Sequence, residues 1–472
     1  MKKLLLALVM LGLSMPAYAA PAVTQEGAAA LKKLSEAALA KQESSLKSAG
    51  LTLIKQGDVV VEEAGTYYAV TSPNLSLKMP DGVTRNIGMI AINAIPTDDP
   101  KIYKMAVALP TPIVDTDAAG NTVGTLTIGS QTMNGSFNFD AQNFTSVTGD
   151  YKNIVSTRNN GEHLTIGSLG IRMDLTDQGQ GLWSGPTNIA VADMTYKNAL
   201  GGEYNVKQSD LSAKLDRADL LSVNLFKIKL QQAMSGAPGP QRDDKIKQML
   251  RSFLGTFADG LDLMSASSGI TFKSVLDGKT SAGTIASSNI TLGLKDIKSN
   301  KGTFTINSAT QGLKFEDPNS AQFAPSQITL QAAGSGLSLQ KLLNMPATDK
   351  INLKEILSQP GSKLTVQKMD VAAQAFGMNA TADLTSAPQT PLGASGNIHL
   401  NVRGVEALSG WLMDPNGAAA SGVQVPPALI PTLAIMQLSG QASGDGMRTY
   451  DVVLDSKGGI TMNGTPIAAP KQ

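Results

Sequence analysis

The sequence predicts a mainly β protein made of extended, curved antiparallel sheets of hairpins, with a few accessory helices. Short segments alternate bulky apolar residues with Thr or Ser, which is typical of strands with one buried and one solvated face. Asp-Gly and Asn-Gly dipeptides recur between these segments and suit tight hairpin turns that need positive φ. The repeat has no fixed period, so we expect a long meander of hairpins rather than a regular solenoid.

The strand segments are short and are separated by Gly, Pro, Asn or Asp. The clearest alternation occurs in Gly124–Gly129, Leu164–Gly167, Gly269–Phe272, Asn289–Leu292, Gly302–Ile306, Gln327–Leu330 and Gly459–Met462. Other strand-like segments are Val59–Val61, Tyr67–Val70, Leu75–Leu77 and Ile87–Ile92. The predicted hairpin turns are Asp81–Gly82, Asn134–Gly135, Asn160–Gly161, Asp277–Gly278, Asn416–Gly417 and Asn463–Gly464.

Helical spacing of Leu and Ala predicts a first helix between Thr24 and Ser48, which Gly50 ends. Its apolar stripe is narrow, so we expect this helix to pack on a sheet or to lie on the surface. Further helices are expected over 216–234, 243–257, 349–357, 405–412 and 427–436.

Residues 1–19 have the pattern of a cleavable export signal. Lys2 and Lys3 precede the apolar run Leu4–Leu13, and Ala17–Ala19 supplies small residues for cleavage near Ala19/Ala20. We therefore expect an exported, periplasmic protein without a transmembrane span in its mature chain. The domain prediction is an N-terminal β-rich half over 20–235, a Pro/Gly break with a helical connector over 236–262, and a C-terminal β-rich half over 263–472.

Composition excludes several classes of protein. The chain has 39 basic and 38 acidic residues, and 37 against 38 without Lys2 and Lys3, so it offers no electrostatic footprint for nucleic acid. It has no Cys, which excludes disulfides, thiol catalysis and thiolate metal sites. Aromatic residues make up 4% of the chain, few for sugar-stacking platforms, with Trp183 and Trp411 the only indoles.

No catalytic residues are predicted, so a non-enzymatic protein is expected, without a cofactor or a metal. The two histidines are His163, at the start of a strand, and His399, on the polar face of another strand. The pairs Ser44/Lys47 and Ser338/Lys341 match the spacing of a Ser/Lys nucleophile but lack its companion motifs, and no G-x-S-x-G elbow is present.

Acidic clusters also favour structural explanations. The segment Asp115–Asn121 begins like a calcium-binding loop but lacks the bidentate Glu, so a hairpin turn is the preferred interpretation. Glu62–Glu63 and Asp98–Asp99 are expected on strands, where neighbours face opposite ways. Asp243–Asp244 is placed at a helix start, where acids complement the helix dipole.

The apolar face of the strands leaves two interpretations open. If helices cover it fully, it is ordinary core. If the sheet curls without enough helices, an apolar groove remains that suits an acyl chain, and the 19 Met residues favour an adaptable surface. The first hypothesis is thus a protein that shields lipid or another amphiphile. The alternatives are a structural or protein-interaction factor of the cell envelope and, with less support, a hydrolase with an unrecognised site.

Two segments near the C-terminus carry a family resemblance. One is Tyr450–Leu454 followed by Gly459–Pro466, and the other is Gly396–Val402 leading into the helix at Val405. In these segments and in its overall arrangement the chain resembles the YdgA-like family of uncharacterised Gram-negative envelope proteins, which are loosely similar to AsmA-like proteins. The resemblance implies an envelope location and no catalytic residues. A cleavable signal in place of an N-terminal anchor departs from that family.

Overall fold

Antiparallel strands dominate the computed structural model and join into one 26-stranded sheet, which confirms the predicted mainly β fold. The structure describes residues 21–48, 50–220, 256–276, 279–299, 301–317, 321–339, 359–414, 429–444 and 446–467, with the shorter pieces 222–223, 226, 230, 244–246, 249, 253–254 and 353–357. The predicted export signal lies outside these residues.

The helices and the early strands are short, apart from the first helix. The helices are α2 (Gln25–Ser48), α7 (Leu353–Ile356), α8 (Val405–Met413) and α9 (Leu429–Ser439). The early strands are β1 (Thr52–Gln56), β2 (Val60–Ala64), β3 (Tyr67–Thr71), β4 (Asn74–Lys78), β5 (Thr84–Gly88), β6 (Ala91–Pro96), β7 (Ile102–Ala108) and β8 (Ile113–Thr116).

The later strands include much longer ones. They are β9 (Thr122–Asn138), β10 (Asn143–Arg158), β11 (His163–Asp174), β12 (Thr176–Asp177), β13 (Leu182–Lys197), β14 (Glu203–Asp219), β15 (Phe257–Leu276), β16 (Lys279–Lys295), β17 (Gly302–Gln311), β18 (Lys314–Phe315) and β19 (Gln327–Leu337). The last group is β20 (Lys363–Ala372), β21 (Gly377–Ser386), β22 (Ala394–Arg403), β23 (Gln441–Ala442), β24 (Met447–Leu454), β25 (Ile460–Met462) and β26 (Thr465–Ile467).

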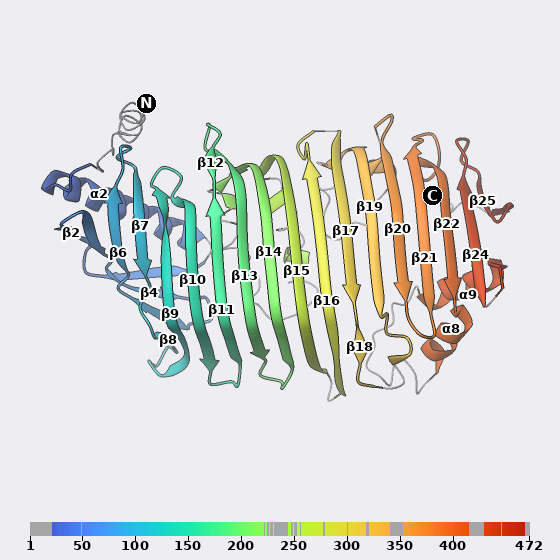
Figure 1. The fold of residues 1–472 in the computed structure, drawn as a ribbon, viewed down its shortest axis with the longest axis horizontal. Coiled ribbons are helices and arrows are strands. Elements are labelled where there is room, and N and C mark those ends of the chain that lie inside the picture. Colours follow the sequence, from blue (N-terminus) through green and yellow to red (C-terminus); the bar gives the residue numbers. More distant parts are fainter. Residues whose placement is uncertain are drawn as a thin grey trace, which may run out of the picture.

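The sheet runs as a meander from β9 to β26 and divides in two on the other side of β9 (Figure 1). The start of β9 pairs with β8, which leads to β5, β4 and β1. The end of β9 pairs with β7, which leads to β6, β3 and β2. Every pairing is antiparallel, as the predicted meander requires.

The sheet is continuous across the predicted Pro/Gly break. Strand β14 pairs with β15 along nearly its whole length, from Glu203↔Lys273 to Ala218↔Phe257. The strands of the 20–235 half and of the 263–472 half therefore belong to one sheet, and residue 263 lies inside β15.

Helix α2 confirms the helix predicted between Thr24 and Ser48. The Thr24 hydroxyl accepts a hydrogen bond from the Gly27 amide at its start. Gly50 adopts φ of +77° after its end, and its amide donates to the Lys47 carbonyl. The stripe that contains Leu31 and Leu46 is buried against the strands, so the helix packs on the sheet.

Of the six predicted hairpin turns, three occur as predicted, one is wrong and two lie outside the described residues. Asp81–Gly82, Asn160–Gly161 and Asn463–Gly464 connect neighbouring strands as predicted, whereas Asp277–Gly278 and Asn416–Gly417 lie outside the described residues. The turn prediction at Asn134–Gly135 is wrong, because both residues lie inside β9. A Cβ on Gly135 would lie 2.1 Å from the Ser146 carbonyl oxygen, so this glycine allows a close approach of β10 instead of a turn.

The strand predicted over Ile87–Ile92 is divided in the structure. Gly88 has φ of +90° and ends β5, and β6 begins at Ala91. The two pieces then enter different branches of the sheet, β5 beside β8 and β6 beside β7. The change of direction at a positive-φ glycine is the physical reason for the break.

The two predicted connector helices begin and end differently from the prediction. Residues 216–219 belong to β14 and Phe257 to β15, because Ala218 and Phe257 form a cross-strand pair with no exposed surface. The described residues between them, such as 222–223 and 244–246, are helical. Helices α8 and α9 confirm the predicted 405–412 and 427–436 segments, and α7 covers the described part of 349–357.

A line of irregular pairs crosses the sheet from β9 to β16 and ends at Gly312, directly after β17. The pairs are Gly129 with Asn153, Gly167 with Asp193, Lys207 with Gly269, and Ala286 with Gly312. From β9 to β16, these residues are skipped in the regular register of cross-strand pairs. One member of each pair has positive φ, between +51° and +67°. Tyr151 and Ile154 lie on either side of Asn153 and are three residues apart, so a regular strand would place them on opposite faces. They pack in the same cluster, which shows that the alternation of side chains reverses at this line.

Three larger clusters bury the apolar face at its margins. One follows the strand ends around Leu215, Phe257 and Leu337. A second lies beneath α2, and a third lies beneath α8 and α9 around Val402 and Tyr450. The Tyr450 hydroxyl donates to the Met436 carbonyl of α9 at 2.6 Å. Helices α2, α8 and α9 therefore cover the two ends of the sheet, near β2 and near β24 (Figure 1). Between these ends, the helical residues Phe253, Leu254 and Ile356 pack against the cluster around Leu215.

An ion pair between Glu406 of α8 and Arg448 of β24 predicts a pH effect on stability. Hydrogen bonds from Arg448, at 2.6 and 2.8 Å, are the main cause of a lowered Glu406 pKa. A carboxyl whose pKa falls on folding stabilises the fold above its unfolded pKa, and this contribution disappears as pH drops through the folded value. Glu406 is exposed and Arg448 is half-buried, so we expect an effect of about 0.2–1 kcal/mol.

The measurement is the urea midpoint at several pH values between about 6 and 3. The wild-type midpoint should fall more steeply below the ordinary pKa of 4.5 than the midpoint of Glu406→Gln. Parallel curves for the two proteins would contradict the assignment.

Candidate functional site

One row of residues crosses the apolar face of the sheet from strand to strand, and its members are apolar except for Gly149, Ser265 and Ser308. Each residue of the row is the direct cross-strand partner of the next, so all of them point to the same face. The row, called the apolar row below, is Met133, Gly149, Ile171, Ile189, Leu211, Ser265, Ile290, Ser308, Leu330, Met369, Ala380, Leu400 and Tyr450. It takes one residue from each strand in the order β9, β10, β11, β13 to β17, β19 to β22 and β24.

The centre of the apolar row is open. Ile189 is 39% exposed, Leu211 40%, Ile290 43% and Met369 36%, whereas Tyr450 at its end is 2% exposed. Single exposed apolar residues are ordinary, but several on one face can form a binding surface. Ile189 and Leu211 are direct partners, and Ser265 and Ser308 lie between the other exposed apolar residues of the row. The helices that the structure describes therefore cover this face only in part, which is the arrangement that the groove interpretation requires.

The length of the apolar row determines how large a molecule it can hold. Neighbouring strands lie about 4.8 Å apart, so twelve intervals between thirteen strands give roughly 58 Å. An acyl chain of a bilayer lipid extends across about half of the roughly 30 Å hydrocarbon core. The row is thus several times longer than one acyl chain.

The opposite face of the sheet, next to the apolar row, is polar. Its row also runs through direct partners and holds small or polar residues: Asp150, Gly170, Ala190, Asp210, Ala266, Asn289, Ala309, Thr329, Asp370, Asn379, Asn401 and Thr449. Arg172 on this face binds Asp150 at 3.0 Å. The sheet is therefore amphipathic along its length, with hydroxyl, amide and carboxylate groups on the solvated side.

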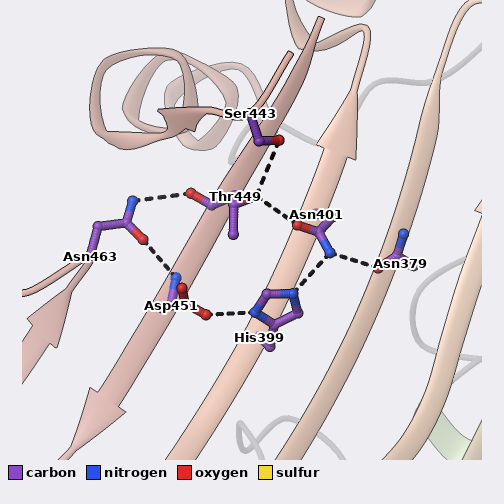
Figure 2. Close-up of polar contacts among 7 residues, drawn as sticks. All are labelled: Asn379, His399, Asn401, Ser443, Thr449, Asp451 and Asn463. Carbon is purple, nitrogen blue, oxygen red and sulfur yellow. Dashed lines mark hydrogen bonds and ion pairs between the residues drawn. The ribbon is translucent and has the colours of Figure 1, made fainter. Parts of the chain in front are cut away.

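His399 belongs to a polar network on this solvated face (Figure 2). Its Nδ1 lies 2.5 Å from Asp451 Oδ1, and its Nε2 accepts a hydrogen bond from the Asn401 amide at 2.9 Å. The Asn401 amide also donates to Asn379, and the Thr449 hydroxyl donates to the Asn401 carbonyl oxygen. These bonds place the proton of a neutral imidazole on Nδ1.

The geometry of this network supports a structural role for His399. A general base needs a free nitrogen within reach of a nucleophile or a water, but Asn401 occupies Nε2. The His399 side chain is 46% exposed and that of Asp451 60%, so the pair lies on an open surface and not in a cleft. Asn463 binds the backbone of β24 through the Asp451 amide and the Thr449 carbonyl, which holds the last hairpin in register.

The other histidine and the Ser/Lys pairs are separate from this network. His163 begins β11 and pairs with Lys197 of β13. Ser44 and Lys47 lie on α2. Ser338 is fully buried, and Lys341 lies outside the described residues.

The Asp115–Asn121 segment forms the preferred hairpin turn between β8 and β9. Asp115 is buried and accepts two hydrogen bonds from Arg85, at 2.8 and 2.9 Å. Hydrogen bonds from the Asn121 side chain, and then from backbone amides, lower the pKa of Asp117. Both carboxylates are thus used inside the fold. Within the described part of the chain, no three His, Asp or Glu side chains gather as a metal-ligand set.

The remaining acidic pairs contact the backbone or solvent. Glu62 and Glu63 lie on β2 as predicted and are exposed. Asp98 and Asp99 lie in the turn between β6 and β7, so their assignment to a strand is wrong. The Asp99 carboxylate accepts the Lys101 amide there. Asp244 lies at the start of a helical piece, and Asp243 lies outside the described residues.

Fold and surface define the class of this protein: a long antiparallel sheet with one apolar and one polar face, and with helices packed on parts of the apolar face. Neither a scan against protein-family models nor a search of curated proteins finds a match to this chain. Among the residues that the structure describes, no helix combines the length and apolar character needed to cross a membrane.

Proposed function

We propose that this chain is an exported periplasmic protein that binds the acyl part of a lipid or similar amphiphile along the apolar row and shields it from water. The single observation that carries the proposal is the exposure of Ile189, Leu211, Ile290 and Met369 in one cross-strand row. The polar opposite face keeps the loaded protein compatible with water. The predicted export signal and the resemblance to YdgA-like envelope proteins agree with this role.

The free energy gained by burying the exposed apolar surface of the row is large enough for binding. Fully burying a Leu, Ile or Met side chain contributes about 1.5–3 kcal/mol. About two fifths of the surface of each of the four open side chains is still exposed, so each can add on the order of 1 kcal/mol. Each buried methylene of the ligand adds about 0.8 kcal/mol. Binding along the row therefore improves with chain length.

The test is whether lipid copurifies with the exported protein under gentle conditions. Mass spectrometry of an organic extract should detect acyl lipids in the wild type. The double variant Leu211→Asp with Ile290→Asp should retain less than about a tenth, because two carboxylates on the apolar row must be desolvated for an acyl chain to bind. Ser212→Asp with Asn289→Asp is the matched control, since these neighbours face the polar side.

Three results would contradict the proposal. Wild-type protein that is free of lipid after mild purification would do so, and so would equal lipid in the two double variants. A stoichiometric protein crosslinked to a photoreactive residue at position 290 in cells would instead support the envelope-interaction alternative.

A further inference from the structure

A cavity lies between helix α2 and the sheet, close to the branch point of the strands. Its volume is about 350 Å³, within the size range of ligand pockets. Ala38 and Leu39 of α2 line one side, and Met105, Phe137 and Phe144 line the other. In Figure 1 this is the blue end of the molecule, where α2 lies beside β6 and β7.

The lining has the chemistry of an alkyl-chain site. Val, Leu, Ile, Met and Phe side chains form most of it, and none of the residues that line it is charged. Two of the polar ones, Ser35 and Gln42, belong to α2, where Gln42 is exposed. The Ser72 hydroxyl is already used, since it donates to the Pro73 carbonyl and accepts from the Ile90 amide. A mostly apolar lining of this kind suits an alkyl chain, with few polar groups to orient it.

The cavity continues the apolar row at its β9 end. Phe137 is four residues from Met133 on β9, and both point to the same face because strand side chains alternate. Phe137 pairs directly with Tyr103 and Phe144, and Met105 pairs with Gly135, so these side chains share that face. A chain that lies along the row can therefore enter the cavity without crossing the polar side of the sheet.

The occupant that fits these observations is a single alkyl chain. A peptide segment would bring backbone amides and carbonyls to walls that offer few partners, which is costly. An alkyl chain needs no polar partner and can bend between the aromatic side chains. We propose that the α2 cavity binds the terminal part of one acyl chain and so fixes the end of a lipid on the apolar row. This inference rests on the proposed function.

Because Ala38 is small, larger residues at this position can be used to fill the cavity. Ala38→Trp should fill it, whereas Ala40→Trp, two residues along the helix, is the control on an exposed position outside the lining. The probe is 11-(dansylamino)undecanoic acid, titrated by fluorescence into the full purified chain. We expect saturable binding to the wild type and to Ala40→Trp, and at least a tenfold higher Kd for Ala38→Trp. Ala38→Leu, a milder change, should give an intermediate Kd, and circular dichroism checks the folding of each variant.

The outcomes separate the two proposals. Unchanged probe affinity in folded Ala38→Trp and Ala38→Leu would overturn the cavity site, even if lipid still copurifies with the wild type and is lost from the Leu211/Ile290 variant. Probe binding that Ala38→Trp abolishes in a protein that carries no lipid would support the cavity and overturn the role of the apolar row. No probe binding to the wild type would overturn the cavity proposal.

Discussion

Phe257→Ala is expected to lower the free energy of unfolding by about 3–5 kcal/mol. Phe257 has no exposed surface, begins β15 and pairs with the fully buried Ala218 of β14. Its ring meets that of Phe253 edge to face, with centroids 5.1 Å apart. Truncation therefore leaves a cavity at the place where the predicted halves of the chain share their sheet.

Urea unfolding, followed by circular dichroism, measures this change. Phe272→Ala is the control, because Phe272 lies on the same strand but is only half-buried, and its loss should cost about 1–2 kcal/mol. Equal effects of the two substitutions would show that the β14–β15 junction is not a principal contributor to stability.

Gly185→Ala is expected to destabilise the fold by about 2–5 kcal/mol. Gly185 has φ of +153°, and an added Cβ would lie 2.0 Å from the Asp174 carbonyl oxygen and 3.0 Å from the Leu175 Cα. The backbone must move there to make room. Leu175 and Trp183 beside it are buried in the cluster around Leu215, Phe257 and Leu337, so the movement disrupts packing as well.

Gly179→Ala separates the contact from the backbone conformation. Gly179 also has positive φ, at +77°, but nothing lies within 4 Å of an added Cβ. Its substitution should cost about 1 kcal/mol, the conformational part alone. If the urea midpoints of the two variants coincide, the close approach at Gly185 does not limit stability.

Strand positions could be predicted from the sequence because period-two alternation and turn dipeptides are local signals. The segment Leu164–Gly167 shows this, since its alternation places it in β11. The branch at β9 could not be predicted, because strands of both branches carry the same alternation. Gly88 and Gly135 show the same limit: a glycine can turn the chain, or it can let a neighbouring strand approach.

The apolar row could not be predicted from the sequence for a different reason. The sequence correctly places apolar and polar groups on opposite faces, as for His399 between Ile398 and Leu400. It does not show which residues lie side by side across thirteen strands. The line of irregular pairs reverses the alternation in mid-strand, and residues such as Asn153 and Asp193, with φ of +53° and +51°, give no clear sequence signal for this.

The α2 cavity also needed the structure, because its two sides are distant in sequence. Ala38 and Phe144 line the same cavity although β1 to β9 separate them in the sequence. The contacts of His399 with Asp451 and Asn401 depend in the same way on the pairing of β22 with β24. A carboxylate on the strand after a histidine-bearing strand is a weak signal, since it does not fix the register.

Since each long strand pairs mainly with its neighbours in the chain, the molecule can be lengthened or shortened by whole hairpins. Removing two adjacent strands would take away about 10 Å of width and leave the flanking ladders able to rejoin in the same direction. Gene duplication or deletion of whole hairpins would therefore change the length of the apolar row in steps of two strands.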